Sequence, residues 1–121
     1  MKFHLQTADA HLVTGLGDGW IRVGPDEHRA NCVLTPDGVV EGFAPGGFDA
    51  LTDADFAALL AHQPEIVLLG TGKTQRFPHP RLSAALGAAR VGLEIMDTRA
   101  ACRTYNILLG EGRRVVAALL L

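Results

Sequence analysis

The pattern of hydrophobic and polar positions changes near residue 50 of the chain. Before that point, short runs of branched and aromatic side chains alternate with turn residues, which is typical of β-hairpins. The runs Trp20–Val23 and Arg29–Thr35 are separated by the turn signal Gly24-Pro25-Asp26. Thr35-Pro36-Asp37-Gly38 then precedes Val39–Phe43 and predicts a hairpin, because proline presets φ for a turn and glycine tolerates positive φ. We expect a loop from there to residue 50.

A helix is predicted just after this loop. Thr52, with Asp55 three residues later, is typical of a capping box at a helix start. Leu51 and Phe56 occupy the two positions of a hydrophobic staple, which fixes how the chain enters the helix. We expect the helix to stop at Pro64, because proline cannot continue it.

Three apolar runs in the second half predict strands: Glu65–Gly70, Leu93–Met96 and Arg113–Leu121. The first run is nearly continuous, as in strands that are covered on both faces. Helical patterns separate the runs, so we expect a β-α-β-α-β order with parallel strands and right-handed crossovers. The hairpin half adds strands at an edge of this sheet or forms a small second layer. The predicted fold is a single mixed α/β domain over residues 1–121.

Two helices are predicted between those strands. One begins near Pro80 and ends at Gly92, with an apolar face that packs on the sheet. The other has Asp97 or Thr98 as its cap. Tyr105 falls on its core-facing side, and we expect its hydroxyl at the rim of the core.

Composition and charge narrow the function classes. A 121-residue chain that is 48% hydrophobic can fill the interior of one domain. Its net charge of −2 argues against a nucleic-acid partner, because such a protein needs a basic face. Val115–Leu121, the longest apolar run, is far shorter than the ~20 residues of a membrane span, and Met1 to Thr14 lacks the apolar core of a signal peptide. We therefore expect a cytoplasmic protein without a membrane segment.

Known metal and nucleotide motifs are not matched. Cys32 and Cys102 are too few for a disulfide framework and lack the spacing of a zinc site. Gly72-Lys73-Thr74 has the form of the end of a P-loop, but Val67 stands where that motif needs glycine. The dinucleotide fingerprint fails at Gln75, where it also needs glycine. We expect no metal and no cofactor.

Two loops that follow predicted parallel strands are candidates for a binding site: Gly70–Thr74 and Asp97–Arg99. Ligands of open α/β sheets gather beyond the carboxyl ends of parallel strands. The second loop leads into a helix N-terminus, whose free N–H groups favour an anion. Arg99, Arg103 and Asn106 share one polar face of that helix at i, i+4 and i+7. The alternative interpretation is a capped helix with a solvated polar face. The candidate binding residues are Gly70, Thr71, Gly72, Asp97, Thr98, Arg99, Arg103 and Asn106.

Cys102 is the better of two candidate nucleophiles. Ser83 lies within a helix without a nucleophile elbow. Cys102 lies near Arg99 and Arg103, and positive surroundings can lower the pKa of a thiol enough to make it reactive. Free cysteines are also among the most buried residue types, and we favour an inert thiol.

A carboxylate pair, Glu94 and Asp97, lies at the end of one predicted strand. Glu94 is placed within an apolar strand, so it either reaches an edge or is buried with a partner. A buried carboxylate needs a partner because its desolvation is costly. We expect a structural ion pair with Arg99 or Arg103 rather than an acid–base pair, and we assign no catalytic residue.

Four segments carry a resemblance to a known family: Gly70-Thr71-Gly72, Glu94-Ile95-Met96-Asp97-Thr98, Ala100-Ala101-Cys102-Arg103-Thr104-Tyr105-Asn106-Ile107-Leu108 and Glu111-Gly112-Arg113-Arg114-Val115. Most specifically over residues 65–117, the chain resembles a small family of single-domain proteins with a Mth-type domain. That family includes mitochondrial complex I (NADH dehydrogenase) assembly factor 3 and an adipogenesis-associated relative. The resemblance implies a three-layer mixed α/β fold and brings no catalytic residues.

The resemblance also implies a role in assembling a respiratory NADH dehydrogenase, with a subunit of that complex as protein partner. Such a partner would hold the chain at the inner membrane peripherally. The Ala-, Leu-, Gly- and Arg-rich composition is typical of a bacterial protein. We therefore predict a non-enzymatic, partner-binding protein. The alternative is a protein or enzyme that binds a small anionic ligand in the crevice between the Gly70–Gly72 and Asp97–Arg99 loops.

Overall fold

The computed structural model describes residues 11–121, arranged around two β-sheets. One sheet has three strands, in the order β1 (Val13–Gly17), β2 (Trp20–Val23), β3 (Asp26–His28). The other has five, in the order β5 (Gly38–Glu41), β4 (Cys32–Thr35), β8 (Val115–Leu120), β6 (Ile66–Thr71), β7 (Gly92–Met96). The prediction that Met1 to Thr14 lacks the apolar core of a signal peptide falls mostly on residues 1–10, which lie outside the described residues. In the part that is described, no helix has both the length and the apolar character needed to cross a membrane.

The small sheet is formed by β1 (Val13–Gly17), β2 (Trp20–Val23) and β3 (Asp26–His28), all antiparallel. The prediction of one continuous strand over Arg29–Thr35 is wrong. The chain leaves the small sheet after β3 and enters the large sheet at β4 (Cys32–Thr35). β1 was not predicted, because two glycines among its five residues weaken the β pattern.

The predicted hairpin at Pro36-Asp37 is confirmed. It joins β4 to β5 (Gly38–Glu41), and Thr35 pairs with Gly38 across the turn. β4 also pairs antiparallel with β8, so this hairpin extends one edge of the large sheet. The sequence left two arrangements open for the hairpin half, strands at an edge of the large sheet or a small second layer. Both occur: β4 and β5 extend the edge, and β1, β2 and β3 form the separate small layer.

The parallel centre of the large sheet consists of β6 (Ile66–Thr71), β7 (Gly92–Met96) and β8 (Val115–Leu120). β6 pairs in parallel with both of the others, as the sequence predicts. All residues of β8 are buried. Its side chains alternate between two cores, with Val116 in one and Val115 in the other, so β8 is covered on both faces.

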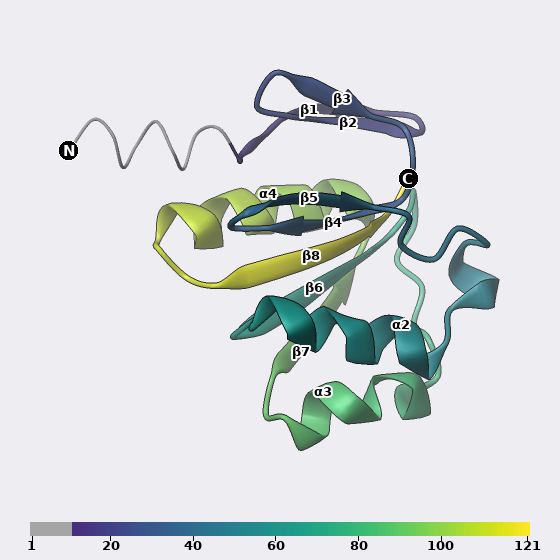
Figure 1. Ribbon diagram of the computed structural model, residues 1–121. Helices are drawn as coiled ribbons and strands as arrows, with labels where there is room; N and C mark the ends of the chain where they lie inside the picture. The colour runs from purple at the N-terminus through teal and green to yellow at the C-terminus, as the bar shows by residue number, and fades with distance from the viewer. Residues whose placement is uncertain (1–10) are drawn as a thin grey trace.

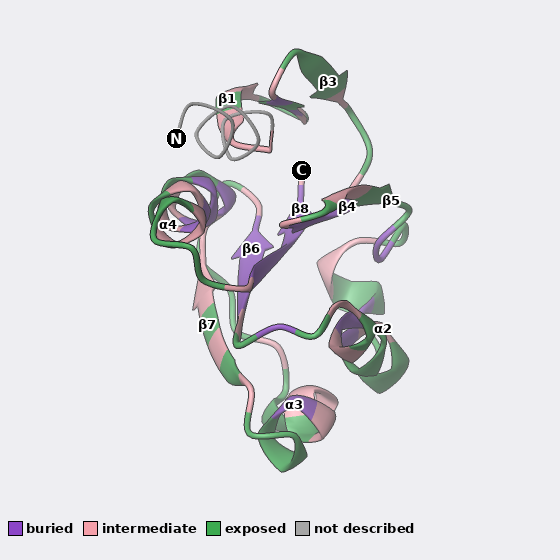
Figure 2. Cartoon of the chain, turned by 60° about the vertical axis from the view of Figure 1, so that its left-hand side comes forward, coloured by how far each residue is buried: buried purple, intermediate pink, exposed green. Residues whose placement is uncertain are grey.

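The helices complete three layers (Figure 1). The short helices α2 (Asp53–Ala58) and α3 (Ala84–Ala88) lie on one face of the large sheet. The long helix α4 (Thr98–Gly110) and the small sheet lie on the other face (Figure 2). Figure 2 also shows that burial concentrates in the central strands and in the inward sides of the helices. The expected three-layer mixed α/β fold is confirmed.

Two of the predicted helices are partly 3₁₀ in the structure. The capping box is present: Asp55 N donates to Thr52 Oγ1 at 3.2 Å, and Thr52 N donates to Asp55 Oδ2 at 2.9 Å. α2 ends at Ala58, and the 3₁₀ turn Leu59–His62 follows it. The C-cap of that turn, Gln63, has φ 55° and lies one residue before Pro64, where the sequence predicts the stop. The helix expected near Pro80 likewise opens with a 3₁₀ turn before α3.

Tyr105 does not place its hydroxyl at the rim, which corrects the prediction. Its side chain is completely buried, and the hydroxyl donates to the Thr35 carbonyl oxygen at 3.0 Å. A buried hydroxyl needs such a partner, because leaving its hydrogen-bonding capacity unused is costly. Burial also raises the pKa of Tyr105. The bond fastens α4 to the β4–β5 hairpin.

Candidate functional site

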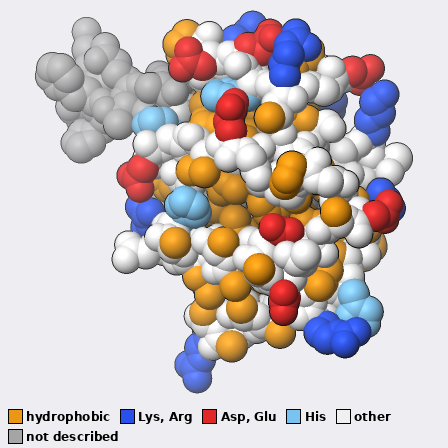
Figure 3. Space-filling view, turned by 45° about the vertical axis from the view of Figure 1, so that its right-hand side comes forward, with side chains coloured by type: hydrophobic (Ala, Val, Ile, Leu, Met, Phe, Trp, Pro, Cys, Tyr) orange, Lys and Arg blue, Asp and Glu red, His pale blue; other side chains and the backbone are white. Residues whose placement is uncertain are grey.

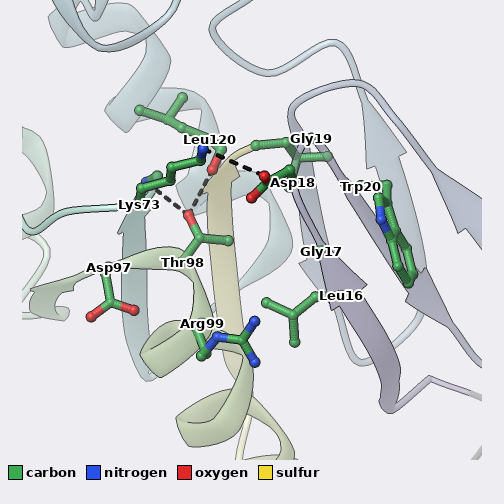
Figure 4. A pocket seen from close by; sticks show the side chains of 12 residues that line it. Leu16, Gly17, Asp18, Gly19, Trp20, Lys73, Asp97, Thr98, Arg99 and Leu120 are labelled. Atoms are coloured by element: carbon green, nitrogen blue, oxygen red, sulfur yellow. Dashed lines mark hydrogen bonds and ion pairs between the residues drawn. The ribbon is translucent and has the colours of Figure 1, made fainter.

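A cavity of about 460 Å³ lies beyond the carboxyl ends of the parallel strands (Figure 4). Three parts of the chain form its walls: the β1–β2 hairpin, the loops that follow β6 and β7, and the end of β8. Both loops predicted from the sequence therefore face one cavity. The lining residues are Leu16, Gly17, Asp18, Gly19, Trp20, Gly72, Lys73, Asp97, Thr98, Arg99, Leu120 and Leu121.

Thr98 joins the ends of the strands at the base of this cavity. Its Oγ1 accepts a hydrogen bond from Gly72 N at 2.8 Å and donates to the Leu120 carbonyl at 2.6 Å. Thr98 N donates to Gly72 O at 2.9 Å. The side chain is buried, and both bonds of its hydroxyl go to backbone groups. Thr98 therefore holds the site together rather than offering a free hydroxyl to a ligand.

Gly70 and Thr71 also act on the framework of the site. A Cβ at Gly70 would lie 3.1 Å from the Thr98 Cα, so α4 approaches β6 closely because this residue has no side chain. Thr71 Oγ1 donates to Thr74 O at 2.7 Å and accepts from Arg76 N at 3.0 Å. Those two bonds fix the start of the loop after β6, which carries Gly72 and Lys73 into the cavity wall.

Asp97 is the N-cap of α4 and starts the helix as the sequence predicts. Its Oδ1 accepts a hydrogen bond from Ala100 N at 2.9 Å. In Figure 4 its carboxylate points away from the β1–β2 hairpin, whereas Arg99 extends toward Leu16 on that hairpin. Arg99 is therefore the cationic helix residue that faces the opposite wall.

The acidic and basic side chains that line the larger cavity are equal in number. Lys73 Nζ lies 3.5 Å from Asp18 Oδ2, and both side chains are more than three-quarters exposed, at 80% and 88%. Such an ion pair contributes little to stability because water screens it. The remaining two charged residues of the lining, Asp97 and Arg99, also have opposite signs. Charge alone therefore does not make this cavity an anion site.

Arg103 and Asn106 line a second, smaller cavity of about 280 Å³ between β1 and α4. Asn106 uses its amide to fasten β1 to the helix. Its Oδ1 accepts from Val13 N at 2.8 Å, and its Nδ2 donates to Val13 O at 2.9 Å. Of the three polar residues predicted to share this helix face, Arg99 and Arg103 are exposed, whereas Asn106 is half-buried.

The Cys102 thiol is buried at 2% exposure in the core beneath α4. Burial raises the pKa of Cys102 to about 12, and the opposing effect of the Arg99 charge is smaller. Burial likewise raises the pKa of Cys32 to about 12. Thiols are nucleophilic as thiolates, so both cysteines are held in their unreactive form at neutral pH.

We expect iodoacetamide to leave Cys32 and Cys102 unmodified in the folded protein at neutral pH, because neither thiol is exposed or ionised. In denaturant both should react at the rate of a free cysteine. Mass spectrometry of timed samples measures the two rates. Rapid stoichiometric alkylation of Cys102 in the folded state would contradict this prediction.

Glu94 is exposed on β7, the edge strand of the large sheet. The expected ion pair with Arg99 or Arg103 is wrong: none of the ion pairs found within residues 11–121 includes Glu94. An edge position keeps the carboxylate in water, so it needs no counter-ion. A charge on an edge strand also discourages pairing with other chains.

Two parts of the cavity lining were not predicted from the sequence: the hairpin wall, including Asp18 and Trp20, and the end of β8 at Leu120 and Leu121. Asp18-Gly19 was the available signal, because an Asp-Gly pair between two apolar runs is typical of a tight hairpin. No local signal places that hairpin above α4. In the described part of the chain, no group of three His, Cys, Asp or Glu side chains could hold a metal ion.

Comparison with known proteins assigns the chain to a family. Residues 13–120 match the family described as "Protein of unknown function (DUF498/DUF598)". The chain belongs to this family. The resemblance inferred from the sequence is thereby confirmed, and it extends over both sheets and α4.

Several named proteins and solved structures are similar to this chain. Mouse NADH dehydrogenase (ubiquinone) 1 alpha subcomplex assembly factor 3 is 39% identical over 92 residues, which cover 74% of this chain and 49% of that protein. The chain thus spans about half the length of that relative. A crystal structure from Bordetella parapertussis has 42% identity and a TM-score of 0.80, covering 90% of this chain and 93% of the other. A Bordetella pertussis solution structure, described as a Mth938-like domain, has 34% identity and a TM-score of 0.69, covering 93% and 86%.

Proposed function

We propose that the protein is a non-enzymatic, partner-binding factor that acts in the assembly of a respiratory NADH dehydrogenase. The observation that carries this proposal is the 39% identity to mouse assembly factor 3 over 74% of the chain. The proposed location is the cytoplasm, with attachment to the inner membrane through a subunit of the complex.

The surface supports binding to another protein. On the face shown in Figure 3, apolar side chains gather in a broad area, with acidic, basic and histidine side chains around it. Among the described residues, the large apolar side chains with the greatest exposure are Phe77 at 68%, Ile107 at 56% and Val40 at 47%. These three side chains belong to the segment after β6, to α4 and to β5, so they are separate positions; it is a gathered apolar area such as that in Figure 3 that is typical of surfaces that bind proteins.

The chemistry of the candidate site also supports binding rather than catalysis. Burial keeps the Cys102 thiol protonated, and the Thr98 hydroxyl is bonded to backbone on both sides. Neither group meets the requirement of a nucleophile, which must be activated and accessible to a substrate.

The assembly role predicts that identified NADH dehydrogenase subunits or their assembly proteins are enriched when the tagged protein is purified from its own cells, including detergent-solubilised membranes. Mass spectrometry against an untagged control measures the enrichment. A preparation in which these proteins are no more abundant than in the control would overturn the assembly role.

A second candidate function is the binding of a small anionic ligand in the larger cavity. Its volume of about 460 Å³ lies within the ordinary range of ligand pockets, and Arg99 faces its opposite wall. The candidate binding group is the exposed Arg99, since the backbone N–H and C=O of Gly72 are already bonded to Thr98. A purified protein that retains a small molecule but no NADH dehydrogenase subunit would favour this function.

A further inference from the structure

The two cavities are neighbours on the surface. Both are lined by Leu16 and Arg99, so the smaller cavity between β1 and α4 adjoins the larger cavity at the sheet end. We call the two adjoining cavities together the β1–α4 groove; β1 forms one wall and the first two turns of α4 form the other. β1 has five residues, so the wall is long enough for about five extended residues at about 3.4 Å each.

One wall of the groove is the outer edge of a sheet. Among the strands of residues 11–121, β1 is an edge strand of the small sheet and pairs with β2 alone. At Val13, the Asn106 amide supplies both an acceptor and a donor to the backbone, as a neighbouring strand would. The rest of β1 lines the groove; Gly15 and Gly17 have no side chains of their own, and the Arg22 and Trp20 side chains of β2 lie against these two positions. An extended chain is the shape of partner that suits such an edge.

The other wall carries two positive charges. Arg99 and Arg103 are exposed and one helical turn apart, and the ion pairs within residues 11–121 leave both without an acidic partner. Like charges at i and i+4 repel each other and destabilise a helix. The smaller cavity has no acidic residue in its lining. Negative charge from outside the chain would therefore be favourable at this end of the groove.

The far end of the groove has a different character. Leu16, Trp20 and Leu120 contribute apolar surface there, and the acidic and basic side chains of that lining are equal in number. A ligand that follows the groove thus meets unpaired positive charge first and then a cavity of balanced charge, in which these three side chains add apolar surface. A short inorganic anion could use only the first of these two environments.

We propose that the β1–α4 groove binds an extended, acidic segment of a partner protein. An acidic side chain of that segment lies between Arg99 and Arg103, and a neighbouring apolar side chain enters the larger cavity. This inference rests on the proposed partner-binding function and names the chemistry of the partner and the surface that receives it.

The test uses the full ¹⁵N-labelled chain and two capped hexapeptides, GLELEG and its neutral match GLQLQG. We expect GLELEG to shift the amide signals of β1 and of the first two turns of α4, and to bind about tenfold more tightly than GLQLQG. The double variant Arg99→Glu/Arg103→Glu should lose this preference. Circular dichroism checks that the variant is folded.

Arg81→Glu/Arg90→Glu is the matched control. Arg81 and Arg90 are also exposed arginines, they flank α3 on the opposite face of the sheet, and their reversal changes the net charge by the same amount. We expect this control to bind GLELEG as the unaltered protein does. Equal binding of the two peptides, equal loss in both double variants, or no shift with GLELEG would overturn the proposal. Binding of phosphatidylglycerol vesicles in place of GLELEG would assign the arginines to lipid headgroups and would also overturn it.

The groove and the assembly role can fail separately. If NADH dehydrogenase subunits co-purify equally with the unaltered protein and with Arg99→Glu/Arg103→Glu, the assembly role stands and the groove is not its docking surface. If GLELEG binds as expected but no subunit co-purifies, the groove proposal stands and the assembly role is wrong.

Discussion

Replacing Thr98 by valine is expected to lower the free energy of unfolding by about 2–4 kcal/mol. Valine keeps nearly the same shape but removes the hydroxyl that bonds to Gly72 N and to the Leu120 carbonyl. The bond to the Leu120 carbonyl is buried and the bond from Gly72 N is partly buried, so both backbone groups lose a partner where access of water is restricted. Chemical denaturation monitored by circular dichroism measures the change.

Thr98→Ser is the control for this prediction. Serine keeps the hydroxyl and loses only a methyl group, so most of the stability should return. If Thr98→Val unfolds at the same denaturant concentration as the unaltered protein, the hydroxyl is not what joins the strand ends. A loss of stability in Thr98→Ser as large as in Thr98→Val would point instead to packing of the missing methyl group.

Replacing Gly70 by alanine is expected to destabilise the protein by about 1–3 kcal/mol through overpacking. The added Cβ would meet Leu119 Cδ2 at 2.9 Å, Thr98 Oγ1 at 3.0 Å and Thr98 Cα at 3.1 Å. The leucine methyl group can rotate away, but the helix backbone at Thr98 can move only by shifting α4. The same shift would displace one wall of the larger cavity. Denaturant titration measures the stability, and amide shifts around Thr98 report the movement.

Gly92→Ala, on the neighbouring strand β7, is the matched control. A Cβ at Gly92 would lie 3.7 Å from Ile66 Cγ1, which is an ordinary contact. Its effect should stay within about 0.5 kcal/mol, as for most surface substitutions. Equal stability of the two alanine variants would show that α4 does not depend on a bare backbone at Gly70.

The position of the candidate site was predictable from the sequence, because it depends on where the parallel strands end. The apolar runs before Gly70 and Asp97 predict parallel strands, and parallel strands end on the same edge of a sheet. The roles of the individual residues were not predictable in this way. Asn106 has the same helical spacing as the two arginines, but its amide is used by Val13, 93 residues away in the chain. Whether the predicted residues bind a ligand or a partner remains a prediction.

The fold shows the same division between neighbouring and distant residues. The sequence by itself determined the capping box at Thr52, the hairpin turn at Pro36-Asp37 and the three parallel strands, because each depends on residues close together in the chain or on one repeating pattern. Only the tertiary structure decided that β4 pairs with β8, that the small sheet lies over α4, and that Arg99 and Arg103 line a groove. Those contacts join segments far apart in the chain, and burial of two complementary surfaces selects them. Neither segment carries a local signal of its partner.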